Sequence, residues 1–406
     1  MIDSVAERPR RHVVEPDWLG LIHPQTRALE ESGIVEVFNY GRDRQGLIPL
    51  WVGEGDLVTP AFISEAASRS LAAGETFYTN QRGVPELREA IARYMTRVYG
   101  RAPGGGDFSP EQFFVTVGGM HALEIAARLV AGPGDEVIVP SPAWPNFYGA
   151  IGLAGAKTVF APMIAGAEWR LDIDRIADFV NQATRAIILN SPANPTGFAA
   201  TLDELIALRD LARNHGLWII ADEIYGRLVY EGVRAPSLHD VMAADDRILF
   251  VQTLSKNWSM TGWRIGWLEA PPELGPVIEN LVQYSTSGVP VFAQRAAIAA
   301  LDEGEAFFAH QLSRIRQGRD IICDGLAAIA RVRFARPDGA FYLFCSIEGD
   351  EDTRSLALKL VDEAGIGLAP GSAFGAGGEG FLRICFARKA EDMAEATRRL
   401  TAWLAR

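Results

Sequence analysis

The central part of the chain alternates short apolar runs with helix-like segments, and this alternation limits the possible folds most strongly. Seven runs of strand length occur, at 113–117, 136–139, 157–161, 186–189, 217–221, 248–252 and 264–268. The first five are continuously apolar, as expected for strands buried on both faces. Strands that alternate with helices form a mostly parallel sheet covered by helices. We therefore predict an α/β fold whose ligands bind beyond the carboxyl ends of the strands.

The segments between these runs carry helix signals. Periodic apolar residues occupy 122–131, 172–181 and 202–214. The last of these follows a capping box at Thr201 and Glu204 and stops at Gly216, as helices commonly do. Beyond Pro290 the pattern changes to long helices followed by strands, at 292–301, 304–329, 340–347 and 390–405. A chain of 406 residues can hold two or three domains. We predict a second, smaller α+β domain, preceded by an irregular N-terminus with a possible helix near 26–32.

Composition excludes several classes of partner. The net charge is −12 with acids and bases interspersed, which disfavours nucleic acid and anionic membranes. No apolar run reaches the roughly 18 residues of a membrane helix, and the N-terminus lacks the apolar core of a signal peptide. The three cysteines are scattered, and Cys323 and Cys385 lie in apolar sequence typical of a core. We expect a cytoplasmic protein without a metal.

One loop carries the chemistry that most needs explaining. Lys256 follows the sixth apolar run in a hydroxyl-rich loop, and Arg264 comes eight residues later. A lysine amine condenses with an aldehyde when its surroundings hold it near neutrality, and hydroxyls with an arginine suit a phosphate. An amine beside a phosphate site indicates pyridoxal phosphate. A lone lysine in a loop is, however, usually a solvated charge. The residues at the other strand ends are therefore needed to distinguish a cofactor site from a solvated loop.

Three other strand ends carry polar residues or glycines. Gly118 and Gly119 open a helix whose N–H groups could hold an anion, although such turns are common without a ligand. Asn194 lies in a turn rich in Pro and Gly, and the proline that follows it permits a cis peptide bond. Alternatively, the turn only reverses the direction of the chain. Asp222 could cap a helix. Alternatively, its carboxylate could keep a pyridine nitrogen protonated, which makes the ring an electron sink.

Together these segments resemble the class I/II aminotransferases, pyridoxal-phosphate enzymes of the aspartate aminotransferase fold (fold type I). The resemblance is carried by 253–267, by 194–197, and by Asp222 with Tyr225, and it extends from Gly53 to Arg383 in the family's order. The arginine loop is most similar to the bacterial subgroup that acts on aspartate, alanine or aromatic amino acids. The resemblance implies an N-terminal arm (1–48) packing with the small domain, a large domain (49–290) with a seven-stranded sheet, and a small C-terminal domain (291–406).

The resemblance also implies a role for each matching residue of the cofactor site. Lys256 matches the Schiff-base lysine that also shuttles the proton, and Asp222 matches the partner of the ring nitrogen. Tyr225 and Asn194 match the residues that hydrogen-bond the phenolic oxygen. The phosphate ligands match the side chains of Thr253 and Arg264 and the backbone of Gly118, Gly119 and Met120. Trp144 matches the aromatic that stacks on the ring, although it could be a plain core tryptophan.

Further matches concern the substrate and a second subunit. Arg383 matches the arginine that grips the substrate α-carboxylate, and Gly53 matches a backbone position beside it, with Asn194 and Trp144 near the substrate. Tyr78 matches a tyrosine that reaches the phosphate of the neighbouring subunit, which implies a homodimer with shared active sites. The chain departs from the family at Gly55, where a proline is usual, and at Thr253, where serine is usual. His121 has no assignable role. The loop 284–290 falls where the family places residues near the substrate side chain.

The activity implied is transfer of an amino group from an L-amino acid to a 2-oxo acid by a ping-pong mechanism. A lyase, a decarboxylase or a synthase on the same fold would share the cofactor motifs. A regulatory protein with an aminotransferase-like domain is a remoter alternative. Such proteins carry an added winged-helix module, and the fewer than about 50 residues before Gly53 are too few for one.

Overall fold

The computed structural model describes residues 17–27 and 32–405. Two units can be separated, Met1–Glu31 and Ser32–Arg406. In the first, α1 (Trp18–Leu21) is capped by the Asp17 carboxylate, and α2 (Pro24–Arg27) follows. The helix expected near 26–32 falls largely on residues 28–31, which lie outside the described residues. All elements below belong to the second unit.

A seven-stranded sheet forms from the seven predicted runs. Its strands are β2 (Phe113–Thr116), β3 (Glu136–Ser141), β4 (Lys157–Pro162), β5 (Thr184–Asn190), β6 (Trp218–Asp222), β7 (Ile248–Thr253) and β8 (Gly266–Glu269). Their order is β2-β8-β7-β6-β5-β3-β4, and β8 alone runs antiparallel to its neighbours. The predicted run 264–268 begins two residues early, because Arg264 adopts a left-handed conformation (φ 51°) before β8. The mostly parallel sheet is confirmed.

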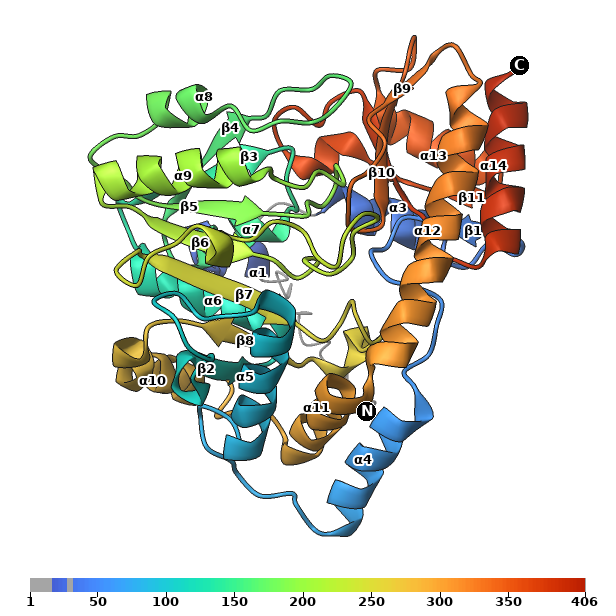
Figure 1. The fold of residues 1–406 in the computed structure, drawn as a ribbon. Coiled ribbons are helices and arrows are strands. Elements are labelled where there is room, and N and C mark those ends of the chain that lie inside the picture. The colour runs from blue at the N-terminus through green and yellow to red at the C-terminus, as the bar shows by residue number, and fades with distance from the viewer. Residues whose placement is uncertain (1–16, 28–31, 406) are drawn as a thin grey trace, which may run out of the picture. The chain divides into compact units, whose positions relative to one another are not determined.

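Helices cover both faces of this sheet. On one face lie α6 (Gly118–Val130) and α7 (Asn146–Leu153), and on the other lie α8 (Ile173–Asp178) and α9 (Leu202–His215) (Figure 1). Alternate residues of one strand enter different cores: Ile220 packs on the α6 side, while Ile219 and Ala221 pack on the α9 side. The predicted capping box of Thr201 and the left-handed Gly216 bound α9. Burial on both faces explains why these strands read as continuous apolar runs.

The remaining helices extend from residue 33 to residue 404. They are α3 (Gly33–Gly41), α4 (Ala61–Ala72), α5 (Pro85–Tyr99), α10 (Gly275–Ser285), α11 (Val291–Glu303), α12 (Glu305–Ala327), α13 (Thr353–Glu363) and α14 (Ala390–Leu404). In this part of the chain, α12 packs against α14, and α11 packs against α4 and α5. The four predicted elements beyond Pro290 are therefore present, as α11, α12, β10 and α14.

A second, antiparallel sheet lies in the C-terminal part, in the order β12-β13-β10-β9. Its strands are β9 (Val332–Phe334), β10 (Tyr342–Ile347), β12 (Ala369–Pro370) and β13 (Phe381–Cys385). The segment after residue 32 joins this region, because α3 contacts α13 and β12, and β1 (Ile48–Pro49) pairs with β11 (Ile366–Gly367). The predicted domain boundaries stay a prediction.

A buried polar cluster lies next to the carboxyl end of β6. His239 Nε2 lies 3.1 Å from both carboxylate oxygens of Glu269, and its Nδ1 lies 3.0 Å from Ser237 Oγ. Ser237 Oγ in turn donates to Glu223 (2.7 Å), the residue after Asp222. Burial lowers the pKa of His239, but the nearby carboxylates outweigh it and raise that pKa overall. Burial also raises the pKa of Glu223, so a protonated His239 would offset the charge of the carboxylates buried around it.

The described residues hold neither a membrane-spanning helix nor a cluster of metal ligands. None of the helices in residues 17–27 and 32–405 is long and apolar enough to cross a membrane. Within the same residues, no group of three or more His, Cys, Asp or Glu could hold a metal ion. The three cysteines are unpaired and buried, in agreement with the core position predicted for Cys323 and Cys385.

Candidate active site

The carboxyl ends of β5, β6 and β7 deliver predicted residues to one cavity of about 410 Å³. The predicted residues that line it are Gly53, Trp144, Asn194, Asp222, Tyr225, Lys256 and Arg383. They come from segments up to 330 positions apart in the sequence, and the parallel strands bring three of these segments to the same sheet edge. The peptide bond between Asn194 and Pro195 is cis, as the sequence permitted.

Lys256 is a partly buried residue whose amine has no carboxylate partner among the described residues. Its Nζ donates to the carbonyl oxygen of Gly53 (2.7 Å), and it lies 5.9 Å from the centre of the Phe341 ring. Gln311 holds the loop in place, because its Nε2 donates to the Lys256 carbonyl (2.7 Å). Burial lowers the pKa of Lys256 to about 8, so an appreciable fraction of the amine is uncharged near neutral pH. An uncharged amine is what attack on an aldehyde requires.

Asp222 ends β6 with a side chain that is almost fully enclosed. The residue is 2% exposed, and within the described chain its carboxylate accepts one hydrogen bond, from the N–H of Ile224 (3.3 Å). Burial raises the pKa of Asp222 to about 7. A buried carboxylate with so few donors is costly, and a cationic N–H group placed against it would remove that cost.

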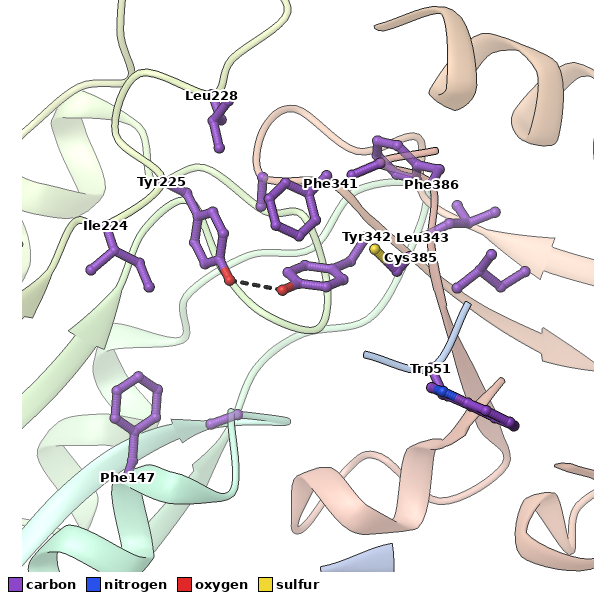
Figure 2. Packing of buried hydrophobic residues seen from close by; sticks show 14 of the residues in the cluster. Trp51, Phe147, Ile224, Tyr225, Leu228, Phe341, Tyr342, Leu343, Cys385 and Phe386 are labelled. Carbon is purple, nitrogen blue, oxygen red and sulfur yellow. Dashed lines mark hydrogen bonds between the residues drawn. The ribbon is translucent and has the colours of Figure 1, made fainter. Parts of the chain in front are cut away.

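Tyr342 is a site residue that the sequence reasoning missed. Its hydroxyl lies 2.8 Å from that of Tyr225, and the two rings meet edge to face (Figure 2). Tyr342 also approaches Gly53 closely, since a Cβ built there would lie 2.2 Å from its hydroxyl oxygen. The available signal was a tyrosine inside the apolar run 340–347, because a buried tyrosine hydroxyl usually needs a partner.

Arg383, from β13, is a buried guanidinium with unused donors. The residue is 1% exposed; Nη1 donates to Asn194 Oδ1 (3.0 Å) and Nη2 donates to the carbonyl of Trp51. Its Nε has no hydrogen-bond partner among the described residues. The guanidinium also lies 4.6 Å from the centre of the Tyr342 ring. Unused N–H donors in a fixed planar group suit a carboxylate ligand.

The N-terminus of α6 adjoins this cavity and meets Arg264. Gly118 has φ 75°, and a Cβ there would lie 2.7 Å from Arg264 Nη2, so the backbone and the guanidinium approach closely. Thr253 Oγ1 lies 2.9 Å from Ser255 Oγ. A Cβ on Gly119 would lie 3.7 Å from Thr253 Cβ, so Thr253 lies beside this helix end, where its hydroxyl also contacts the Ile265 carbonyl (3.1 Å). Helix N–H groups, hydroxyls and an arginine form a cradle that fits a phosphate.

The other predicted residues divide into two groups. Met120 and Trp144 lie at or near the cavity: the Met120 sulfur accepts from Asn146 Nδ2 (3.4 Å), and the Trp144 ring stands edge-on to Phe147. His121 has hydrogen-bond partners for both ring nitrogens, since it contacts the N–H of Val117 and the hydroxyl of Ser285. Tyr78 is not brought to the Lys256 cavity, because it is 93% exposed and lines a separate hollow.

The sheet, the cavity and its lysine define the class of protein. The family model for aminotransferases of class I and II matches residues 46–400, and the chain belongs to this family. The lysine, the aspartate and the phosphate cradle described above fit the pyridoxal phosphate that the sequence predicts.

Individual relatives agree on the class and differ in the substrates that their names state. The chain is 32% identical to a probable N-acetyl-LL-diaminopimelate aminotransferase of Bacillus subtilis, over 94% of this chain and 95% of that protein. It is 34% identical to an aspartate aminotransferase of Thermotoga maritima, over 89% and 92% respectively. A crystal structure of aspartate aminotransferase from Thermotoga maritima matches with a TM-score of 0.87 at 32% identity, over 95% of this chain and all of that one. The chain is accordingly an aminotransferase of fold type I.

Proposed function

We propose that this aminotransferase binds pyridoxal phosphate covalently through Lys256 and uses the same amine to move the substrate proton. The observation that carries the proposal is one cavity holding an amine whose pKa is lowered to about 8, a carboxyl whose pKa is raised to about 7, and an arginine with unused donors. Perturbed titratable groups gathered in a cleft are typical of catalytic sites.

Each residue then has a defined task. When bound, pyridoxal phosphate supplies an aldehyde that combines with amines and a ring that accepts an electron pair from a substrate carbon. Asp222 would hold the proton on the ring nitrogen, and Tyr225 and Asn194 would donate to the phenolic oxygen. Lys256 Nζ takes the proton from the substrate α-carbon and returns it. Arg383 pairs with the substrate carboxylate beside Gly53 and so fixes the α-carbon near Nζ.

The phosphate and the ring need further contacts. Thr253, Arg264 and the N–H groups of α6 from Gly118 to Met120 would hold the phosphate, and Trp144 would pack on the ring. We expect cytoplasmic catalysis of the transfer from an L-amino acid to a 2-oxo acid.

A half-reaction screen tests this function. Yellow holoenzyme is mixed with single L-amino acids, without any oxo acid, and loss of the cofactor absorption band is followed. At least one amino acid should bleach the band, and a 2-oxo acid should restore it. Lys256→Ala should lose turnover almost completely, while Lys359→Ala, an exposed lysine on α13, should keep it. Release of ammonia by the wild type without an acceptor would instead identify a lyase, and near-normal turnover of Lys256→Ala would refute the assignment.

We also propose that the enzyme is a homodimer in which Tyr78 serves the neighbouring site. Phe77, Tyr78 and Tyr284 are 85%, 93% and 86% exposed, and large exposed aromatics that occur together mark interfaces. Co-expressed Tyr78→Ala and Lys256→Ala chains should form hybrids with one intact site, restoring about a quarter of wild-type activity. Absence of restoration would place Tyr78 outside a shared site.

A further inference from the structure

Helix α12 passes directly beside the loop that carries Lys256. Gln311, on this helix, is 6% exposed, and both ends of its amide are used. Its Nε2 donates to the carbonyl oxygen of Lys256 (2.7 Å), and its Oε1 accepts from the hydroxyl of Ser259 (2.7 Å). One buried side chain therefore holds the first and the last residue of the segment 256–259.

Ser259 has a strained backbone conformation. Its φ angle is 51°, in the left-handed region that residues other than glycine rarely occupy. Such a conformation persists only where the surrounding structure holds it. Gln311 binds the Ser259 hydroxyl, and the Ser259 carbonyl oxygen accepts from the hydroxyl of Thr59 (2.6 Å). The segment 256–259 is thus kept in an unfavourable shape by contacts from outside the loop, and Gln311 supplies one of these contacts at each end.

The same face of α12 also supports the group that binds the lysine amine. Arg314 lies three residues after Gln311, so the two side chains project from one face of the helix. The Arg314 guanidinium pairs with both carboxylate oxygens of Asp56 (3.1 Å each). Asp56 lies three residues after Gly53, whose carbonyl oxygen accepts from Lys256 Nζ. Helix α12 therefore holds both ends of the lysine side chain, the backbone through Gln311 and the acceptor of the amine through Arg314.

We propose that Gln311 is a positioning residue for the amine of Lys256, with Arg314 as its partner on α12. The inference rests on the proposed function, in which Nζ moves a proton at the substrate α-carbon. A lysine side chain is long and flexible, so the direction of Nζ depends on where its backbone and its acceptor are held. A displacement of about 1 Å can lower the rate about 100-fold. Neither residue of α12 touches the reacting atoms, and both act through Lys256.

Gln311→Met tests the proposal, because methionine is a flexible side chain of similar length that makes neither hydrogen bond. With an amino acid that bleaches the cofactor band, kcat should fall at least about tenfold, while KM stays within about threefold, because Arg383 and the cavity are unchanged. Gln317→Met makes the same change at an exposed position of α12 and should leave both constants unaltered. A kcat of Gln311→Met within about twofold of the wild type would overturn the proposal.

A measurement on the cofactor-free protein reports the position of the amine without any turnover. The rate at which an amine-reactive reagent labels Lys256 is followed against pH by peptide mass spectrometry, with the exposed Lys359 as internal reference. Burial lowers the pKa of Lys256 to about 8, so an amine released from Gly53 toward water should titrate at higher pH. The midpoint of labelling in Gln311→Met should lie at least about 0.5 pH units above that of the wild type. An equal midpoint would contradict the proposal.

Two further variants separate positioning from a merely structural role. Glycine adopts the left-handed conformation without strain, so Gln311→Met/Ser259→Gly should regain most of the stability to urea that Gln311→Met loses, but not its kcat. Recovery of kcat together with stability would reduce Gln311 to a structural support and overturn the proposal. Arg314→Met, at a partly exposed position, should show the same fall in kcat and the same shift of the labelling midpoint. Wild-type behaviour of Arg314→Met would overturn the part assigned to Arg314, and this variant decides alone if Gln311→Met does not fold.

Failure of this inference can be told apart from failure of the proposed function. Near-normal turnover of Lys256→Ala refutes the proposed function itself. Normal turnover of Gln311→Met beside an inactive Lys256→Ala overturns only the role of α12.

Discussion

Replacement of Asp222 by asparagine should stabilise the cofactor-free protein near pH 8 while it abolishes turnover. The carboxylate is 2% exposed and has one backbone donor, from Ile224. Asparagine keeps the shape of the side chain and an oxygen for that N–H group, but it carries no charge. The substitution therefore removes the cost of burying an ionised group and preserves most of the packing.

The magnitude follows from the pKa of the carboxyl. Burial raises it from 3.8 to about 7, and each tenfold change in proton affinity corresponds to about 1.4 kcal/mol, so ionisation at pH 8 costs the fold up to about 4 kcal/mol. Between about pH 4 and pH 7 the folded state holds a proton that the unfolded state has released. The free energy of unfolding therefore falls as pH rises through this window and levels off above it. We expect Asp222→Asn to be about 2–4 kcal/mol more stable than wild type at pH 8, with less than half of this advantage left at pH 5 and none below about pH 4.

Urea unfolding of the cofactor-free proteins at pH 5 and pH 8 measures this difference. Asp107→Asn, an exposed aspartate, is the control and should change stability little at either pH. The holoenzyme of Asp222→Asn should lose at least about 100-fold in kcat, because the ring nitrogen loses the group that keeps it protonated. A variant less stable than wild type at pH 8, or an advantage that persists unchanged at pH 5, would refute the reasoning.

Three further substitutions test other parts of the structure. Gly118→Ala should weaken cofactor binding at least about tenfold, because the φ angle of residue 118 is positive and the new Cβ would displace Arg264. Titration of the cofactor-free protein with the cofactor measures this affinity, and an unchanged affinity would contradict the phosphate cradle. Tyr342→Phe should lower kcat/KM about tenfold with the fold intact, because Tyr225 loses its hydroxyl partner; wild-type kinetics would make the contact incidental. His239→Gln should lower the free energy of unfolding, measured by urea unfolding at pH 7, by about 3–5 kcal/mol, because two buried glutamates lose their cation. A decrease below about 1 kcal/mol would argue against a charged imidazole.

The sheet could be predicted from the sequence because strands buried on both faces consist of continuous apolar residues. A run such as 217–221 contains no polar alternation, and in β6 its residues enter two different cores. The helix before it could be bounded equally well, since the capping box at Thr201 is a local signal. The order of the strands could not be predicted in this way, because it depends on which strands pair across long connections.

The site was predictable where chemistry coincides with a strand end, and not elsewhere. Lys256 and Asp222 are polar residues directly after apolar runs, and the parallel sheet necessarily brings them to one edge. Tyr342 had no such marker, because its contact with Tyr225 joins positions 117 residues apart and depends on how β10 lies against the large sheet. The contacts of Gln311 were hidden for the same reason, since the sequence of a helix does not reveal which loop it borders.

The two buried groups at the centre of the site oppose the stability of the cofactor-free fold over complementary pH ranges. Stability is lost between about pH 4 and pH 7, where Asp222 in the folded state keeps a proton that the unfolded chain has released. It is regained only above about pH 8, where the folded-state amine of Lys256 has lost its proton while the unfolded chain still carries one. The cofactor-free protein should accordingly be least stable near pH 7–8. A ligand that bonds to the amine and places a protonated nitrogen next to the carboxylate removes both unfavourable contributions to the free energy of unfolding. Its binding should therefore stabilise the fold most in that same pH range. Two titratable groups held at such a cost in one cavity are the clearest physical sign that this cavity is built around a bound group.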